Sequence, residues 1–401
     1  MNRVIVASLL CLLTSAAIIA QDDSHPGKPI TYDEGEPPSQ LSFIRCGDLL
    51  YGSSTGRSVG NPVWLFEKSA ARIVKKADGS PVLVQGLGNF AFAVGDALLA
   101  QEHESALWYV IRGETVSRLL GPEDKPFEAD RNAFSRGSRL LPYLFAGPTL
   151  YMLDGDKMIE ITPPEAPKLS VKSWVFTRSA VLYFYGLSPD KTTGAWYFDK
   201  TKAKELKGLK HEPHSICYSS DADYLAIGEN GSYLFDKGKL KEVSNKLNPE
   251  NSIYSVFTLG ETTFFRVRIN SGSGYEYYKA SGKKLLLWKE AKPICEFSAE
   301  WFNHGDRSLV RFENQYFIVT EDEVKEVDWP ERIYPRTVKN AGGTLYVECT
   351  GSGGFVRETT KGFEVIKDAK GADPKLLAWE VGAGGCYIQS YRDPCWYLPN
   401  E

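Results

Sequence analysis

The sequence predicts an all-β protein assembled from repeated units of four short strands. Three observations carry this prediction. Aromatic residues make up 12% of the 401 residues, with 21 Tyr, 20 Phe and 9 Trp against 3 Met, and such side chains favour strands. The 36 Gly and 22 Pro suit a chain with many turns. Short apolar segments also recur at regular intervals, which is the signature of a repeat architecture.

The first twenty residues have the pattern of a cleavable secretory signal. Arg3 supplies a positive charge, the run from Val4 to Leu13 is mainly apolar, and small residues lead to Ala20. The alternative is a membrane anchor, but the run is short for a spanning helix and no stop-transfer pattern follows it. We therefore expect residues 1–20 to be removed, and the mature chain to be secreted or periplasmic without a transmembrane segment.

Residues 21–40 are polar and rich in Pro and Gly, which indicates a flexible N-terminal arm. No linker divides the rest of the chain, so residues 41–401 are expected to form one domain. The last repeat unit stops after its third strand. We expect the segment near Pro29 to Tyr32 to supply the missing strand and to close the ring.

Nine apolar triplets mark the repeat, with an average spacing of about 42 residues. They are Leu49–Tyr51, Leu98–Ala100, Leu150–Met152, Leu182–Phe184, Leu225–Ile227, Phe264–Arg266, Leu309–Arg311, Leu345–Val347 and Tyr387–Gln389. An opening strand precedes most triplets, an aromatic strand follows them, and a strand that alternates apolar and charged residues closes the unit. Units of this length with four antiparallel strands are typical of β-propeller blades.

The number of blades is less firmly fixed by the sequence than the unit itself. The spacing counts nine units, but the third, at about residues 129–161, is irregular, and propellers usually have four to eight blades. We expect eight blades, within a range of seven to nine. An open β-solenoid and two smaller β domains in tandem are the alternative architectures.

Two of the units carry a recognisable sequence pattern. The last unit contains Gly371–Lys375, Leu376–Val381, Tyr391–Asp393 and Trp396–Leu398, and an earlier unit contains His211–Ser215 and Tyr233–Leu240. These segments resemble the DKNYY-type repeat of secreted bacterial proteins, although the Asp-Lys-Asn core is not intact here. More generally, the units are similar to propeller blades of exported bacterial proteins. The resemblance implies export and a repeat architecture, and it implies no catalytic residue.

The composition argues against several kinds of chemistry. The formal net charge of -4 gives no basic face for a nucleic acid. The five His residues are scattered, and no Cys or carboxylate cluster has the spacing of metal ligands. Phosphate-binding loops and nucleophile elbows are also missing from the sequence. We therefore expect no cofactor and no metal.

Two sets of residues are candidates for a site or a staple. Trp288, Trp301 and Trp329 fall outside the aromatic register of the repeat, so they are candidates for a carbohydrate- or peptide-binding rim, with local packing as the alternative. Cys386 and Cys395 flank a short segment, and a hairpin turning at Ser390-Tyr391 would set them opposite each other as a disulfide. The alternative is that most of the cysteines are small buried apolar side chains.

These features favour a non-catalytic, exported propeller that acts as a monomeric platform for an unidentified protein or carbohydrate ligand. The alternative is a propeller hydrolase or lyase that acts on polysaccharide through carboxylates near the ring axis. A convergent cluster of carboxylates or histidines at the central channel would favour the enzyme.

Overall fold

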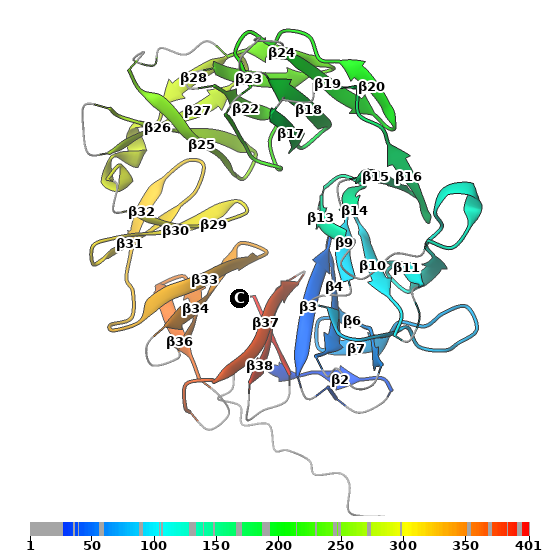
Figure 1. Ribbon diagram of the computed structural model, residues 1–401. Coiled ribbons are helices and arrows are strands. Elements are labelled where there is room, and N and C mark those ends of the chain that lie inside the picture. Colours follow the sequence, from blue (N-terminus) through cyan, green and yellow to red (C-terminus); the bar gives the residue numbers. More distant parts are fainter. Residues whose placement is uncertain are drawn as a thin grey trace, which may run out of the picture.

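The structure is a computed structural model in which a ring of four-stranded blades surrounds a central channel (Figure 1). It describes residues 27–400 apart from short internal segments. These segments are residues 35–36, 39, 56–59, 88–90, 104, 106, 128–133, 139, 147–148, 166–170, 187–192, 214, 229–230, 244–246, 248–249, 271–273, 297–298, 351–353, 368–370, 383 and 391–394. The expected signal at residues 1–20 lies outside the described residues.

The first four blades follow one another along the chain, each starting with its innermost strand. Blade one contains β3 (Leu41–Cys46), β4 (Leu49–Ser54), β6 (Trp64–Glu67) and β7 (Ala70–Ile73), with β5 (Asn61–Pro62) and β8 (Leu83–Val84) as a separate pair. Blade two contains β9 (Ala91–Val94), β10 (Ala97–Gln101), β11 (Trp108–Arg112) and β12 (Thr115–Arg118). Blade three contains β13 (Phe134–Gly137), β14 (Tyr143–Ala146), β15 (Thr149–Asp154) and β16 (Lys157–Ile161). Blade four contains β17 (Val171–Phe176), β18 (Val181–Gly186), β19 (Gly194–Asp199) and β20 (Lys202–Glu205).

The next four blades repeat the same antiparallel order. Blade five contains β21 (Ile216–Tyr218), β22 (Tyr224–Ile227), β23 (Gly231–Asp236) and β24 (Lys239–Glu242). Blade six contains β25 (Ser252–Leu259), β26 (Thr262–Arg268), β27 (Tyr275–Ser281) and β28 (Lys284–Leu287). Blade seven contains β29 (Glu300–His304), β30 (Arg307–Phe312), β31 (Gln315–Val319) and β32 (Val324–Val327). Blade eight contains β33 (Tyr334–Ala341), β34 (Thr344–Thr350), β35 (Phe355–Thr359) and β36 (Gly362–Ile366).

The ninth blade combines both ends of the chain. Its strands are β37 (Leu376–Gly382), β38 (Gly385–Ser390), β39 (Trp396–Pro399) and β1 (Lys28–Pro29). β1 pairs antiparallel with β39, and β2 (Thr31–Tyr32) then pairs with the outer strand of blade one. The N-terminal segment therefore closes the ring, as the sequence predicts. Short 3-10 helices, η1 (Pro122–Asp124) and η2 (Lys289–Ile294), lie in connections between blades.

The described residues thus form nine blades, which is within the expected range and one more than the best single expectation. The third unit is where the sequence pattern misleads. The triplet Leu150–Met152 was expected in the second strand of its blade, but it lies in β15, which is the third strand. The second strand, β14, is only four residues long, and β13 carries a register shift, so this blade lacks the regular spacing of the others.

Each pair of adjacent blades encloses its own hydrophobic core. Nine clusters of buried apolar side chains lie in the described part of the ring, and each combines residues of two consecutive blades. Phe184 of blade four, for example, lies in one cluster with Tyr233 of blade five. The cluster of Leu50 and Tyr397 joins blade one to blade nine. Because no blade can bury both of its faces alone, closure of the ring is part of the folding energy.

Tyrosine hydroxyls connect blades at four joints of the ring. Each comes from a second strand and reaches the turn or end that follows the third strand of the next blade. The pairs are the Tyr51 hydroxyl with the Gly113 N–H at 2.7 Å, Tyr143 with the Lys200 carbonyl at 3.1 Å, Tyr224 with the Gly282 carbonyl at 3.2 Å, and Tyr346 with Asn400 Oδ1 at 3.1 Å. Burial raises the pKa of all four tyrosines, so the hydroxyls remain protonated donors at neutral pH.

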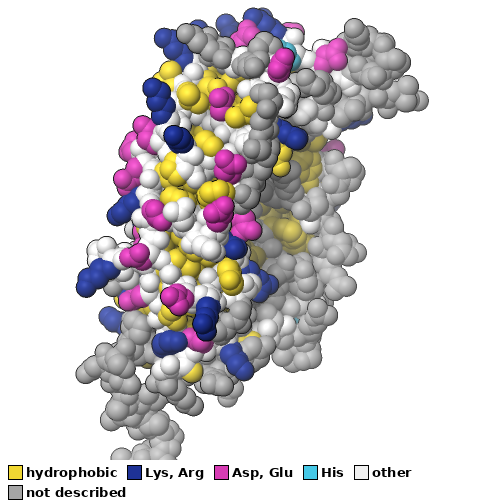
Figure 2. All heavy atoms as spheres, turned by 90° about the vertical axis from the view of Figure 1, so that its left-hand side faces the viewer, with side chains coloured by type: hydrophobic (Ala, Val, Ile, Leu, Met, Phe, Trp, Pro, Cys, Tyr) yellow, Lys and Arg dark blue, Asp and Glu magenta, His cyan; other side chains and the backbone are white. Residues whose placement is uncertain are grey.

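The outer rim of blades six to eight is mixed in character. Figure 2 shows Lys, Arg, Asp and Glu side chains interspersed with apolar ones over this side of the molecule. Leu286 and Leu287, on the outer strand of blade six, are about half exposed. Within the described residues, no helix has both the length and the apolar character needed to cross a membrane.

Candidate functional site

The turns between the first and second strands of the blades, here called the inner turns, surround one mouth of the central channel. Several of them require a left-handed backbone. Gly305 has φ 59° and Gly342 has φ 53°, a conformation that glycine adopts without the steric cost of a side chain. These turns are therefore tight, and they bring the first residues of each second strand close to the channel.

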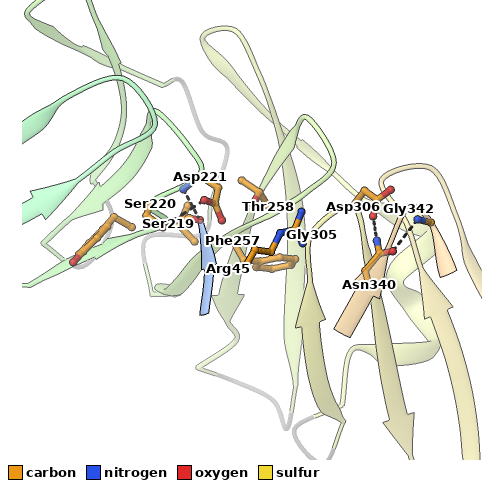
Figure 3. Close-up of a pocket in the computed structure, with 13 residues that line it drawn as sticks. Arg45, Ser219, Ser220, Asp221, Phe257, Thr258, Gly305, Asp306, Asn340 and Gly342 are labelled. Carbon is orange, nitrogen blue, oxygen red and sulfur yellow. Dashed lines mark hydrogen bonds between the residues drawn. The ribbon is translucent and has the colours of Figure 1, made fainter. Parts of the chain in front are cut away.

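A cavity of about 970 Å³ opens at this mouth. Its walls come from the inner strands and inner turns of blades five to eight, and Arg45 of blade one also lines it (Figure 3). The blades that contribute are far apart in the sequence, so only ring closure assembles the lining. The polar groups include the carboxylates of Asp221 and Asp306 and the amide of Asn340, while Phe257 supplies an aromatic surface.

Hydrogen bonds hold the polar lining in place. The Asn340 side-chain amide donates to the Asp306 carboxylate, which joins the inner turns of blades seven and eight. Asn340 Oδ1 also accepts the Gly343 N–H at 2.9 Å. On the other side of the cavity, Arg45 Nε donates to the Gly47 carbonyl at 2.9 Å. Because each of these groups has a partner within the protein, the lining presents fixed donors and acceptors to a ligand.

The aromatic surface of the cavity is supported from behind. The Phe257 ring lies 5.4 Å from that of Phe264 and 5.3 Å from that of Trp301, both measured between centroids. Phe257 is therefore held by the core between blades six and seven while part of it faces the cavity. An aromatic face beside polar groups is a common arrangement for binding amphipathic ligands.

The three tryptophans singled out from the sequence do not come together at one site. Trp288 is 3% exposed, and it packs with Trp301 in the core between blades six and seven. Trp329 lies between blades seven and eight, where it stacks on Tyr316 at a centroid distance of 4.6 Å and donates its indole N–H to the Ile333 carbonyl at 2.7 Å. Trp301 supports the cavity indirectly through Phe257. Contact of these tryptophans with a ligand stays a prediction.

Cys386 and Cys395 are both free, buried thiols in this structure. The strand pairing places Cys386 opposite Leu398, so the hairpin does not set the two cysteines opposite each other as expected. Burial raises the pKa of both thiols, and it raises the pKa of Cys349 to about 12. Such thiols react slowly, because the thiolate is the reactive species. A Cys386–Cys395 disulfide stays a prediction.

The sequence contained a signal for part of the cavity. Several apolar triplets follow a glycine and an acidic residue, as in Gly47-Asp48 and Gly260-Glu261, and Gly305-Asp306 of the cavity has the same pattern. This pattern identifies inner turns, but it does not tell which of them share a cavity. Among the described residues, no group of three or more His, Cys, Asp or Glu side chains is arranged to hold a metal ion.

Comparisons with known proteins agree with the propeller fold and go no further. No protein-family model and no curated protein matches the chain. Among solved structures, the Dos1 propeller is similar at 11% identity and a TM-score of 0.38, over 94% of this chain and 97% of that one. BamB from Moraxella catarrhalis is similar at 11% identity and a TM-score of 0.33, over 80% and 94%. Virginiamycin B lyase from Staphylococcus aureus is similar at 13% identity and a TM-score of 0.31, over 78% and 96%. None of these likenesses assigns a role to the chain.

Proposed function

We propose that this protein is an exported, non-catalytic propeller that binds a polar ligand, or a polar segment of a partner protein, in the cavity at the inner-turn mouth of its channel. The observation that carries the proposal is the cavity itself. It measures about 970 Å³, and hydroxyl, amide, carboxylate and guanidinium groups line it together with Phe257. Binding sites typically combine this concave shape with a few fixed polar groups.

The rigidity of the lining supports a binding role. The polar side chains stand on strands and tight turns of the ring rather than on long loops, and they are hydrogen-bonded to neighbouring blades. Little conformational freedom is lost when a ligand binds to such a surface, so more of the contact energy appears as affinity. The different blades also supply different groups, which gives a basis for specificity.

A hydrolase or lyase that acts on polysaccharide is the second candidate, because the carboxylates of Asp221 and Asp306 line the same cavity. Two carboxylates that flank a glycosidic bond are the usual apparatus of glycosidases. Both side chains are exposed, however, and in Figure 3 they lie well apart with Phe257 between them in view. A general acid of this kind usually needs a buried, apolar setting. The geometry therefore favours binding without catalysis.

Export is part of the proposal, and the N-terminal sequence supports it. The charged, apolar and small-residue regions of residues 1–20 follow one another in the order of a secretory signal. Expression of the full chain in a bacterial host, followed by mass measurement of the exported product, tests this directly. A product that retains residues 1–20, or that stays in the cytoplasm, would contradict it.

The binding role is tested with one substitution at the cavity and a matched control. Asn340→Leu removes the amide that joins two inner turns, and Asn314→Ala changes an exposed asparagine at the opposite end of blade seven. We expect a panel of immobilised oligosaccharides and peptides to contain a ligand that the wild type and Asn314→Ala bind equally and that Asn340→Leu binds at least tenfold more weakly. Binding that is unaffected by Asn340→Leu would refute the cavity. Turnover that Asp221→Asn or Asp306→Asn abolishes would establish the enzyme instead.

A further inference from the structure

One position in the blades carries a charge near the channel. It is the fifth residue of the second strand, and in blades six, seven and eight it is occupied by Arg266, Arg311 and Glu348. The strand pairing makes these positions equivalent. Each lies directly opposite a residue near the start of the inner strand of its own blade, namely Ser255, Glu300 and Thr337.

In blades seven and eight the inner strand neutralises this charge. Arg311 Nη1 lies 3.4 Å from the carboxylate of Glu300, the residue directly opposite. Glu348 lies 3.3 Å from Arg336, which the register shift in β33 places next to Thr337. The fold thus provides a way to compensate a charged residue at this position, either from the opposite residue or from the bulged one.

Blade six lacks this compensation. Arg266 faces Ser255, and the corresponding register shift in β25 presents Tyr254, so neither residue carries a negative charge. No carboxylate of the described residues forms an ion pair with Arg266. The other described arginines that are not exposed each pair with a carboxylate; these are Arg72, Arg112, Arg307, Arg311 and Arg357. Arg266 is therefore exceptional among the half-buried arginines of the described chain.

Aromatic rings hold the Arg266 side chain in place. Its guanidinium carbon lies 3.6 Å from the ring centroid of Tyr275, 5.4 Å from that of Tyr254 and 5.9 Å from that of Tyr277. Nε of Arg266 is buried and has no acceptor among the described residues. Cation–π contacts orient the guanidinium plane and stabilise its charge, but they leave its N–H donors without acceptors. The arrangement is thus preorganised for an anionic acceptor from outside the chain.

We propose that Arg266 and Tyr254 bind an acidic sugar, with the uronate carboxylate on Arg266 and the sugar ring on Tyr254. A carboxylate matches the planar guanidinium with two parallel hydrogen bonds. Tyr254 is 54% exposed, so a face of its ring is free for the C–H face of a pyranose. Both residues stand at the end of blade six away from its inner turn, because Tyr254 precedes the cavity-lining Phe257 on β25. The inference rests on the proposed binding function and adds a ligand class and a second subsite along the channel.

The test compares the trimer of galacturonic acid with its methyl ester, which has the same rings without the negative charges. We expect calorimetric titration of the full mature chain to show at least tenfold tighter binding of the acid. Arg266→Gln should abolish that preference and Arg266→Lys should restore part of it. Tyr254→Ala should weaken binding of the acid at least fivefold and leave weak binding of acetate unchanged. Arg118→Gln, which removes an exposed arginine on blade two, is the control for net charge.

The outcomes separate this site from the cavity. Equal binding of acid and ester by the wild type, no binding of either, or a preference that survives Arg266→Gln would overturn the inference. Binding of a peptide with a free C-terminal carboxylate, without binding of the uronate, would also overturn it. A ligand that responds to Asn340→Leu but not to Arg266→Gln would leave the cavity standing and remove only this subsite. A melting temperature measured for each variant shows that the fold is retained.

Discussion

Replacement of Tyr51 by Phe tests how the blades are joined. The Tyr51 side chain is fully buried, and its hydroxyl accepts the Gly113 N–H of blade two at 2.7 Å. The substitution keeps the ring and leaves that N–H without its acceptor. An unsatisfied, partly buried backbone donor costs about 1–3 kcal/mol, so we expect the free energy of unfolding to fall by about 2 kcal/mol. For a chain of this size that corresponds to a decrease in Tm of about 3 °C.

The same residue predicts a pH dependence. Burial raises the pKa of Tyr51 above its usual value of about 10, so the folded state holds the phenolic proton more tightly than the unfolded chain does. The corresponding stability is complete below pH 10 and is lost as the pH rises above it. Tyr51→Phe removes this group, so its Tm should fall less steeply between about pH 10 and 11.5 than that of the wild type.

Thermal unfolding followed by near-UV circular dichroism at pH 8 and at higher pH measures both effects. Tyr109→Phe is the matched control, because Tyr109 is also buried while its hydroxyl forms no hydrogen bond with a described residue. Hydrogen exchange at the Gly113 amide should accelerate in Tyr51→Phe alone. If the two variants had equal Tm values and equal pH slopes, the inference that this hydroxyl joins the blades would be refuted.

Three further predictions concern charge, thiols and closure. Arg307→Gln leaves the Glu358 carboxylate, 12% exposed, without its guanidinium partner and should cost about 2 kcal/mol, whereas Arg178→Gln, in an exposed pair, should cost less than about 1 kcal/mol; urea unfolding measures both. In the native protein, Cys386 and Cys395 should react with a thiol reagent far more slowly than free cysteine, and a count of two fewer thiols after unfolding without reductant would reveal a disulfide. Deletion of the N-terminal arm through β2 should lower the free energy of unfolding by at least about 3 kcal/mol, because it removes the outer strand of blade nine and a core side chain; an unchanged urea midpoint would show that closure contributes little.

Much of the fold could be predicted because it is written in local repetition. Alternating strands, aromatic third strands and glycine turns recur often enough to define a blade, and the incomplete last unit indicated that the N-terminus closes the ring. The third unit was misassigned because Leu150–Met152 has the same apolar character as the second strands of other blades. Apolar character alone does not distinguish two adjacent buried strands, and in this blade the turn signals that separate them elsewhere are weak.

The candidate site was much harder to predict, because its residues meet only after the ring has closed. Arg45 and Asn340 are almost three hundred residues apart in the chain, and each looks like an ordinary polar residue near a turn. The tryptophans attracted attention through their size, but size is also what the cores between blades require: Trp288 is almost completely buried there. In a protein so rich in aromatic residues, an aromatic side chain is therefore a weak indicator of a binding site.

The repeated fold makes an exception informative. Apolar residues are required at the nine joints, so variation there is limited by packing. The fifth position of the second strand faces a different requirement, because a polar group placed there needs a partner. Glu348 finds one in Arg336, and in blade nine Gln389 accepts the Leu41 N–H and donates to the Pro38 carbonyl. Arg266 has only aromatic rings around it, although its neighbours show that the fold can supply an ion pair. A charge that the fold can neutralise but does not is better explained by a ligand than by stability.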